Sequence, residues 1–513
     1  MLSKTFGSAV YGVEAVTITV EVSVYSGKYS YIVGLPDSAI KESLQRIETA
    51  IKSNGYYMPR IKIVINLAPA DIRKSGTAFD LPIALGIMDA SEQFDKFAID
   101  QYVIMGELSL DGDVRPIKGA LPIAIQARKE GFKGLIVPKA NAREAGIVNN
   151  LKVYGVSHIK EVIEFFRSKE QSLQPTEVNT REEFLYAQSD SDADFSDVKG
   201  QENIKRALEI AAAGGHNAIL IGPPGAGKTM LAKRLPSILP PLSLQESLET
   251  TKIHSVAGKL AENATLISRR PFRSPHHTIS DIALVGGSSP PQPGEISLAH
   301  NGVLFLDELP EFRRSALEVM RQPMEERRVT ISRAKMVVDF PANFMLIASM
   351  NPCPCGFYNH PDRECCCPPG LVQKYLNKIS GPLLDRIDLH VEVTPVGFPE
   401  LSSTKKEEHS DSIRERVIKA RDIQTQRFQN HPGIYSNSQM SSKLLKEICI
   451  INTVGQNLLK AAMQKLHLSA RAYDRILKVS RTIADLSASN EIRPEHIAEA
   501  IQYRSLDREG WGG

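Results

Sequence analysis

The feature that most constrains the fold of this chain is a glycine-rich loop between an apolar run and a helix-forming run. The apolar run covers residues 218–221, and the helix-forming run begins at Met230. A strand, a glycine-rich loop and a helix in this order form a P-loop, in which backbone N–H groups and the positive helix end surround phosphate oxygens. The sequence therefore predicts an α/β domain that binds ATP. The predicted ATP-binding residues are Gly222, Pro223, Pro224, Gly225, Ala226, Gly227, Lys228 and Thr229.

A second apolar run carries two acidic residues at its carboxyl end. Residues 303–306 are all apolar, as in a parallel strand buried on both faces, and Asp307 and Glu308 follow them. We expect Lys228 to contact the β- and γ-phosphates, and Thr229 and Asp307 to hold Mg²⁺. We expect Glu308 to orient and deprotonate the attacking water. The pattern predicts an ATPase rather than a kinase.

Three further residues are predicted to complete the catalytic site. Asn351 follows the apolar run 344–348 and is placed to contact the γ-phosphate and the attacking water. Arg386 lies between two acidic residues before a strand-like run; it is either an ordinary ion-paired arginine or an arginine finger for a neighbouring subunit. Arg471, near the start of a predicted helix, is expected to contact the γ-phosphate. The arginine-finger alternative requires an oligomer.

The same predicted helix, residues 468–486, is amphipathic and basic. Arg471, Arg475, Lys478 and Arg481 follow one another at spacings of four, three and three residues, which places them on one face. We expect an anion-facing surface here. The alternative is a helix that forms ion pairs with its neighbours.

Length and composition predict a multidomain α/β protein. The chain has 513 residues, 42% of them hydrophobic and 24% charged, and a net charge of +3 that neither requires nor excludes nucleic acid. No apolar run is long enough to span a membrane and no basic-then-apolar leader is present, so we expect a cytoplasmic protein with no membrane partner. The predicted parts are an α+β domain over 1–167, an acidic and polar linker over 168–193, an ATPase domain over 194–400 and a helical C-terminal lid over 401–513.

The predicted ATPase domain contains two inserts. Asp307 lies 79 positions after Lys228, whereas a βαβ unit needs only about 30 residues. The second insert, residues 327–340, is predicted to form a β-hairpin with Arg333 and Lys335 at its tip. In a ring, both inserts would project into the pore and form a positively charged channel for the DNA backbone. The alternative is that they are solvated surface loops.

Five of the six cysteines lie close together in the sequence. Cys353 and Cys355 form one Cys-x-Cys pair on a Pro/Gly turn, and Cys365 and Cys367 form a second pair, with Cys366 between them. Two such pairs supply four thiolates for a tetrahedral structural Zn²⁺. A reduced thiol cluster and a redox switch are the alternatives.

Several of these segments resemble one family of proteins. Residues 272–280, 293–312, 351–356 and 469–475 are similar to the corresponding motifs of the YifB/ComM family of magnesium-chelatase-like AAA+ ATPases, and the likeness covers essentially the whole chain. The resemblance implies a bacterial cytosolic protein, a hexameric ring and an ATP-driven branch-migration helicase that acts on single-stranded or branched DNA. A similarity to the related MCM helicases supports Arg386 as the arginine finger. The family usually has a residue other than cysteine at position 366. The additional cysteine in this chain leaves two candidates for the fourth thiolate, Cys366 and Cys367.

The N-terminal part resembles the S5-like fold of Lon proteases. Residues 106–117 and 131–138 are similar to Lon segments, but Ala78 and Leu121 stand where Lon proteases have their catalytic serine and lysine. Without a hydroxyl nucleophile and an amine base, acyl transfer is not possible. We therefore expect a proteolytically inactive domain.

Two functions from different classes compete with a DNA motor. One is a magnesium-chelatase-type ATPase subunit that helps to insert a metal ion into a tetrapyrrole, and the other is a scaffold that uses ATP only for assembly. The Lon-like N-terminal segment favours the DNA motor, because chelatase motor subunits typically lack it. The intact pair Asp307 and Glu308 is evidence against the scaffold.

Overall fold

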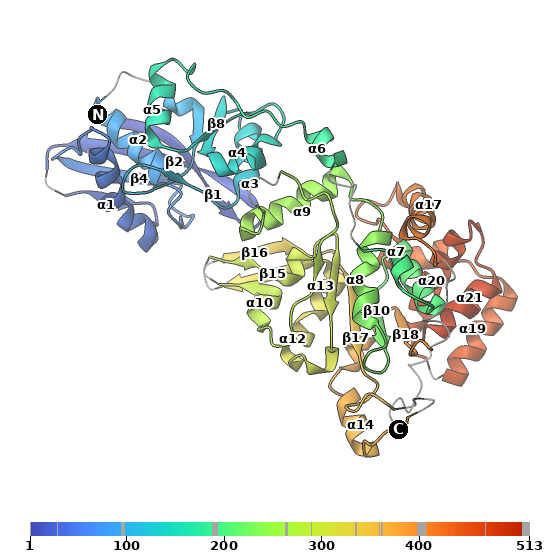
Figure 1. The fold of residues 1–513 in the computed structure, drawn as a ribbon. Coiled ribbons are helices and arrows are strands. Elements are labelled where there is room, and N and C mark those ends of the chain that lie inside the picture. Colours follow the sequence, from blue (N-terminus) through green and yellow to red (C-terminus); the bar gives the residue numbers. More distant parts are fainter. Residues whose placement is uncertain are drawn as a thin grey trace.

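A computed structural model describes residues 2–27, 29–93, 98–186, 193–261, 265–288, 290–333, 336–358, 360, 363–397, 407–466 and 468–504. Figure 1 shows an N-terminal part in blue to teal, a central part in green and yellow, and C-terminal helices in orange and red. Among the helices described, none combines the length and the apolar character needed to cross a membrane.

The N-terminal part is built on a seven-stranded mixed sheet. In spatial order the strands are β3 (Tyr31–Val33), β4 (Lys62–Ala68), β2 (Glu14–Tyr25), β1 (Leu2–Tyr11), β5 (Tyr102–Ile104), β8 (Gly134–Pro138) and β9 (Lys152–Val156). The helices that accompany it are α1 (Ser38–Ser53), α2 (Asp80–Ala90), α3 (Ala120–Lys129), α4 (Lys139–Gly146) and α5 (Ile159–Arg167). Strand β1 has no clear hydrophobic alternation because Ser3, Thr5 and Ser8 are buried in it.

Part of the expected linker is folded. Helix α6 (Thr180–Tyr186) lies within residues 168–193. Glu183 of this helix forms an ion pair with Arg143 at 2.6 Å, and Val178 packs on the N-terminal core. The expectation of a solvated linker is therefore wrong for these residues, because tertiary contacts offset the polar composition.

The central part contains a five-stranded parallel sheet. Its order is β11 (Phe272–Arg273), β14 (Val303–Leu306), β17 (Met345–Met350), β10 (Ala218–Ile221) and β18 (Leu389–Glu392). Every residue of β10, β14 and β17 is buried, as their continuous apolar runs predict. The helices of this part are α7 (Glu202–Gly214), α8 (Lys228–Ile238), α9 (Leu244–Ala257), α10 (Asp281–Val285), α11 (Glu295–Leu298), α12 (Arg314–Val319), α13 (Arg321–Glu326), α14 (Pro369–Leu376) and α15 (Gly381–Leu384).

The C-terminal part is helical and shares a core with the central part. Its helices are α17 (Ser410–Phe428), α18 (Ser442–Ile448), α19 (Thr453–Leu466), α20 (Ala470–Leu486) and α21 (Pro494–Gln502). Val417 of α17 and Ile476 of α20 belong to the same buried cluster as Leu208 of α7. Figure 1 shows α17, α20 and α21 beside α7.

The basic face of α20 is mostly turned into the protein. Arg481 is buried, Lys478 donates to the Ser438 carbonyl oxygen at 2.9 Å, and only Arg471 is exposed. Burial lowers the pKa of Lys478 to about 8. The alternative of ion pairs with neighbouring residues therefore holds for Arg475 and Arg481, whose carboxylate partners come from another segment and from the next helical turn. The ion pairs are Arg475–Asp388 at 2.9 Å and Arg481–Asp485 at 3.0 Å.

Both inserts fold beside each other. The second is the antiparallel hairpin of β15 (Arg328–Arg333) and β16 (Met336–Pro341), and the first contains the small ladder of β12 (Gly286–Gly287) and β13 (Gln292–Pro293). The Arg333 side chain is exposed and lies against Gly287, whereas Lys335 falls outside the described residues. The hairpin also touches the N-terminal part, since a Cβ atom at Gly12 would lie 2.9 Å from Val338. Figure 1 shows the hairpin pointing away from the C-terminal helices.

Candidate functional site

The glycine-rich loop joins the carboxyl end of β10 to the first residue of α8. Gly225 and Gly227 have φ angles of 79° and 83°, a region that favours glycine. A Cβ atom at Gly222 would lie 2.2 Å from the Val393 carbonyl oxygen, so only glycine fits this close approach. The loop therefore has the backbone that a phosphate cradle requires.

Lys228 is the buried cation of the loop. Its Nζ donates to the carbonyl oxygens of Gly222 at 2.7 Å and Pro223 at 2.9 Å, and to Asn351 Oδ1 at 3.1 Å. Burial lowers the pKa of Lys228, and the carboxylates of Asp307 and Glu308 oppose this shift. The structure thus places Asn351 beside the P-loop lysine, 123 residues away in the sequence.

A second group of contacts joins the P-loop helix to the end of β14. Thr229 Oγ1 donates to Asp307 Oδ2 at 2.7 Å, and the Ser349 hydroxyl donates to Asp307 Oδ1. The Glu308 N–H donates to Ser349 Oγ at 3.3 Å. A hydroxyl and a carboxylate at this separation are suitable ligands for Mg²⁺. Ser349 is absent from the sequence prediction, because a serine inside an apolar strand has no local signal.

Glu308 faces open space. Its side chain is 59% exposed, and its backbone has a φ of 54°, which turns it away from the strand. His277 Nδ1, from the first insert, lies 3.6 Å from Glu308 Oε2. The sequence shows His277 only as part of a basic insert, since its partner lies 31 residues later. A cavity of about 420 Å³ beside Glu308 and Asn351 leaves room for a reacting molecule or a neighbouring chain.

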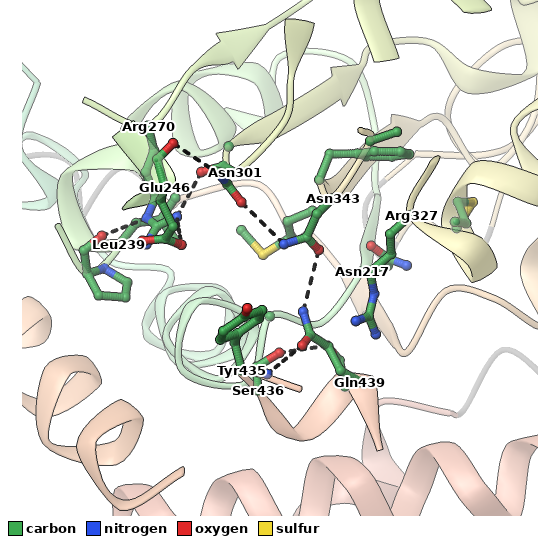
Figure 2. Close-up of a pocket in the computed structure, with 18 of the residues that line it drawn as sticks. Asn217, Leu239, Glu246, Arg270, Asn301, Arg327, Asn343, Tyr435, Ser436 and Gln439 are labelled. Carbon is green, nitrogen blue, oxygen red and sulfur yellow. Dashed lines mark hydrogen bonds and ion pairs between the residues drawn. The ribbon is translucent and has the colours of Figure 1, made fainter. Parts of the chain in front are cut away.

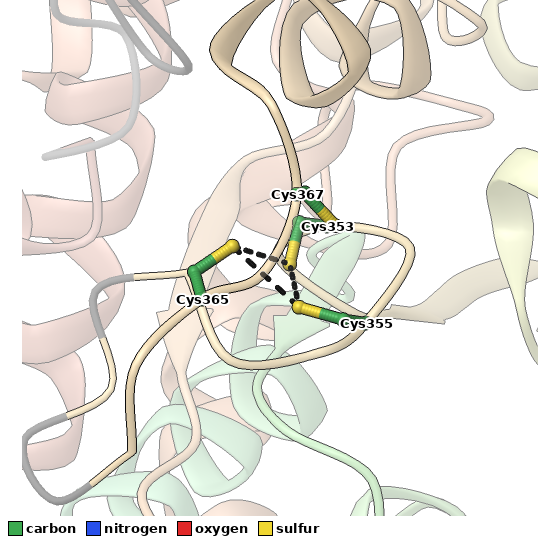
Figure 3. Close-up of side chains that lie close together, drawn as sticks. All are labelled: Cys353, Cys355, Cys365 and Cys367. Atoms are coloured by element: carbon green, nitrogen blue, oxygen red, sulfur yellow. Dashed lines mark hydrogen bonds between the residues drawn. The ribbon is translucent and has the colours of Figure 1, made fainter.

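Four cysteines follow the Asn351 strand end and converge. The ligand atoms of Cys353, Cys355, Cys365 and Cys367 all lie within 4.8 Å of one another, whereas Cys366 is exposed. Figure 3 shows their sulfur atoms pointing toward one another, with separations of 3.3 to 3.6 Å among Cys353, Cys355 and Cys365. Four convergent thiols are the donor set of a structural zinc site.

The cysteine loop touches the P-loop. Gly356, within this loop, has a φ of 85°, and a Cβ atom there would lie 2.4 Å from Pro224 Cδ. Asn351, two residues before Cys353, contacts Lys228. The cysteine cluster therefore supports two elements of the nucleotide site.

The two predicted arginines lie at the amino ends of the strands, and the P-loop lies at their carboxyl ends. Arg386 precedes β18, whose residues Leu389 and Glu392 pair with Ala218 and Ile221 of β10. Because the strands are parallel and rise about 3.3 Å per residue, Arg386 lies near the amino ends of the strands and the P-loop near their carboxyl ends. The guanidinium of Arg386 is 9% exposed and pairs with Glu325 at 2.5 Å.

Arg471 lies on the same side as Arg386. Its side chain is 62% exposed and forms an ion pair with Asp385 at 3.2 Å. The structure therefore brings together Lys228, Thr229, Asp307, Glu308 and Asn351, and it leaves Arg386 and Arg471 at the opposite edge.

A separate cavity lies where the Lon-like segment of the N-terminal part meets the first insert. Ser75, Ala78 and Lys118 line a space of about 560 Å³, and Leu121 is buried in α3. Position 78 lacks a hydroxyl group and position 121 lacks an amine, the two groups that acyl transfer by a Ser–Lys pair needs.

Comparisons with known proteins agree on one family. The chain matches the families described as magnesium chelatase, subunit ChlI, over residues 194–401, subunit ChlI of Mg-chelatase over 20–141, and the subunit ChlI C-terminal region over 407–504. It is 42% identical to competence protein ComM of Haemophilus influenzae, with 99% of this chain and 98% of that protein covered. It is 44% identical to YifB of Escherichia coli over 99% and 98% of the two chains. Lon protease 2 of Bacillus subtilis is 31% identical over 27% of this chain and 26% of its own length.

Proposed function

The chain belongs to the magnesium-chelatase-like AAA+ ATPases that include ComM and YifB, and from this premise we propose that it is a ring-forming DNA motor driven by ATP hydrolysis. Its activity on DNA is that of a branch-migration helicase. The observation that carries the ATPase part is the contact of Thr229 with Asp307 beside Glu308, at the mouth of the P-loop. An assay of ATP turnover with and without single-stranded, duplex and four-way-junction DNA tests the proposal, and stimulation by DNA is the expected result.

The residues of the site have different roles in ATP hydrolysis. When ATP binds, the loop N–H groups and Lys228 receive the phosphates, and the ammonium exchanges two backbone carbonyls for phosphate oxygens. Thr229 and Asp307 would hold Mg²⁺, which neutralises charge on the β- and γ-phosphates. Glu308 accepts a proton from the attacking water, and Asn351 orients the γ-phosphate.

Arg386 and Arg471 act on the nucleotide of a neighbouring subunit in this proposal. Both lie at the sheet edge opposite the P-loop, so neither reaches the nucleotide of its own subunit. A head-to-tail ring places this edge against the next P-loop. We propose a hexamer, in which Arg386 leaves Glu325 to stabilise transition-state charge.

The metal-chelatase alternative rests on the descriptions of the matching families. The DNA motor is supported by the match to ComM, a competence protein, over 99% of this chain, N-terminal part included. A chelatase subunit would not respond to DNA, so the turnover assay distinguishes the two functions.

The hairpin supplies a direct test of DNA contact. We expect the double substitution Arg333→Ala/Lys335→Ala to weaken DNA binding and to lower its salt dependence while basal ATP hydrolysis is kept. Each lost phosphate contact reduces the log–log salt slope by roughly 0.7 to 0.9. Fluorescence anisotropy at several salt concentrations measures both quantities. Arg328→Ala is the matched control, because Arg328 pairs with Glu326 at the hairpin base; equal affinity and slope in wild type and the double variant would refute the pore role.

We also propose one structural zinc ion per chain, held by Cys353, Cys355, Cys365 and Cys367. Elemental analysis of protein purified without added metal or chelator should give about one zinc per chain for wild type and for Cys366→Ser, the control at the exposed cysteine. Cys355→Ser should lose the metal and ATP turnover together, because the loop supports Pro224 and Asn351. Normal turnover by wild-type protein without zinc would disprove this.

A further inference from the structure

A third cavity, with a polar lining, lies at the amino ends of the central strands, away from the P-loop. It has a volume of about 120 Å³ and is lined by segments that precede β10, β14, β17 and β18. The C-terminal part closes it with residues 435–439 and with Arg421 and Arg475. Figure 2 shows this pocket, with Tyr435, Ser436 and Gln439 facing Asn301 and Asn343.

A continuous row of hydrogen bonds frames the cavity. It runs from α9 through the central part to the C-terminal part, and Figure 2 shows its members. Every amide in the row is held in place by another residue, so the wall is preorganised. The bonds are Arg270 to Glu246 (3.1 Å), Arg270 to the Asn301 carbonyl (2.8 Å), Asn343 to Asn301 (3.3 Å), and Gln439 to Asn343 (3.4 Å).

The cavity has more positive than negative charge. Four arginines and two carboxylates line it; Glu246 pairs with Arg270 and Asp388 pairs with Arg475. Arg327 and Arg421 have no carboxylate within 4 Å in the part of the chain that the structure describes. Burial lowers the pKa of both, and repulsion from Arg270 helps to lower that of Arg421 to about 10.

Within the described residues, the hydrogen bonds of both arginines go to carbonyl oxygens. Arg421 donates to the Ala212 carbonyl at 3.0 Å, and Arg327 donates to that of Gly433 at 3.4 Å. Both side chains are half-buried, and a partly desolvated cation is stabilised when an anion replaces the hydration that it has lost. Both arginines therefore retain the capacity to bind an anion.

Hydrogen-bond donors also converge at one point of the wall. A Cβ atom at Gly215 would lie 2.9 Å from Ser436 Oγ, 3.3 Å from Ser438 Oγ and 3.3 Å from Arg421 Nη2. These distances place the two hydroxyls and the guanidinium close together beside Gly215, and the hydroxyls are 3.2 Å apart. Groups of this kind donate hydrogen bonds to the oxygens of a tetrahedral oxyanion.

We propose that this cavity binds a phosphate group, with Arg327 and Arg421 as its counter-charges and the hydroxyls of Ser436 and Ser438 as its donors. The volume accommodates inorganic phosphate or pyrophosphate, or one phosphate of a larger ligand. Because Arg327 follows α13 in the central part, whereas Arg421 of α17 and the 435–439 segment belong to the C-terminal part, a bound phosphate ties the C-terminal part to the central part. Binding there is independent of the P-loop.

The test uses the full chain carrying Lys228→Ala, which removes phosphate binding at the P-loop. Isothermal titration with inorganic pyrophosphate, at constant ionic strength set with chloride, should show one site per chain. Arg327→Gln and Arg421→Lys should each weaken pyrophosphate binding about tenfold, since a charge-assisted hydrogen bond is lost. Arg128→Gln, at an exposed arginine of α3, should bind like the parent.

Two controls make every outcome decisive. Arg421 also holds two backbone carbonyls, so if Arg421→Lys fails to fold by circular dichroism, Arg327→Gln decides the question. Competition with a single-stranded oligonucleotide separates the ligand sources: displacement of pyrophosphate identifies a nucleic-acid phosphate, and simultaneous binding identifies a free anion. The absence of pyrophosphate binding to Lys228→Ala protein, or unchanged affinity in both arginine variants, would overturn the proposal.

Discussion

Glu308→Gln protein should bind ATP with unchanged affinity and lose turnover by about 10²- to 10⁴-fold, the usual contribution of a general base. The amide cannot accept a proton from water, whereas Lys228, Thr229 and Asp307 remain in place for the phosphates. Nucleotide affinity and steady-state phosphate release measure the two effects. Lys228→Ala protein should instead lose tight ATP binding.

A matched control separates this effect from a general loss of charge. Glu311 lies three residues after Glu308 and pairs with Lys378 at 3.2 Å. Glu311→Gln removes the same charge and should keep near-normal turnover, because an exposed ion pair contributes little to stability. Wild-type hydrolysis by Glu308→Gln protein would exclude Glu308 as the base.

Arg386→Ala protein should bind ATP but hydrolyse it at least about 10³-fold more slowly, the lower bound for an arginine finger. Arg386 lies near the amino ends of the strands, whereas the P-loop of its own subunit lies at their carboxyl ends. It can therefore stabilise only the transition state in a neighbouring subunit. Mixing Arg386→Ala with Glu308→Gln protein should restore partial turnover, provided that the subunits exchange. Restoration arises at interfaces that pair an intact Glu308 with an intact Arg386.

Glu325→Gln is the control that distinguishes a finger from a structural ion pair. Arg386 pairs with Glu325, whose side chain is 54% exposed. If the pair only stabilises the fold, Arg386→Ala and Glu325→Gln should have the same small effect. If Arg386 is a finger, Glu325→Gln should keep turnover, because the guanidinium remains available. Full activity of Arg386→Ala protein in dilute, monomeric form would show that the arginine is structural.

The parts of the site that the sequence predicts best are those built from neighbouring residues. The loop from Gly222 to Thr229 and the pair Asp307 and Glu308 each follow one buried strand, so a local apolar run shows where they lie. The order of parallel strands then brings their carboxyl ends together. The Cys-x-Cys pairs are equally local, and their convergence needs only one short loop.

Other features depend on partners that are far away in the chain. The basic residues of α20 suggest an exposed surface from their local charge, but Asp388, almost ninety residues earlier, pairs with Arg475. Helix α6 folds in a polar segment because Glu183 meets Arg143. His277 and Ser349 reach Asp307 and Glu308 from other elements, so no spacing rule identifies them.

The sequence by itself determines the nucleotide chemistry of this protein, because strand, loop and catalytic side chains are consecutive and their geometry follows from backbone preferences. Only the tertiary structure decides at which end of the strands each arginine lies. Charge–charge energies depend on distance and burial rather than on sequence separation. The position of Arg386 and Arg471 opposite the P-loop, and the place of Arg327 and Arg421 in a cavity with fewer carboxylates than arginines among its described lining residues, therefore emerge only when the chain is folded.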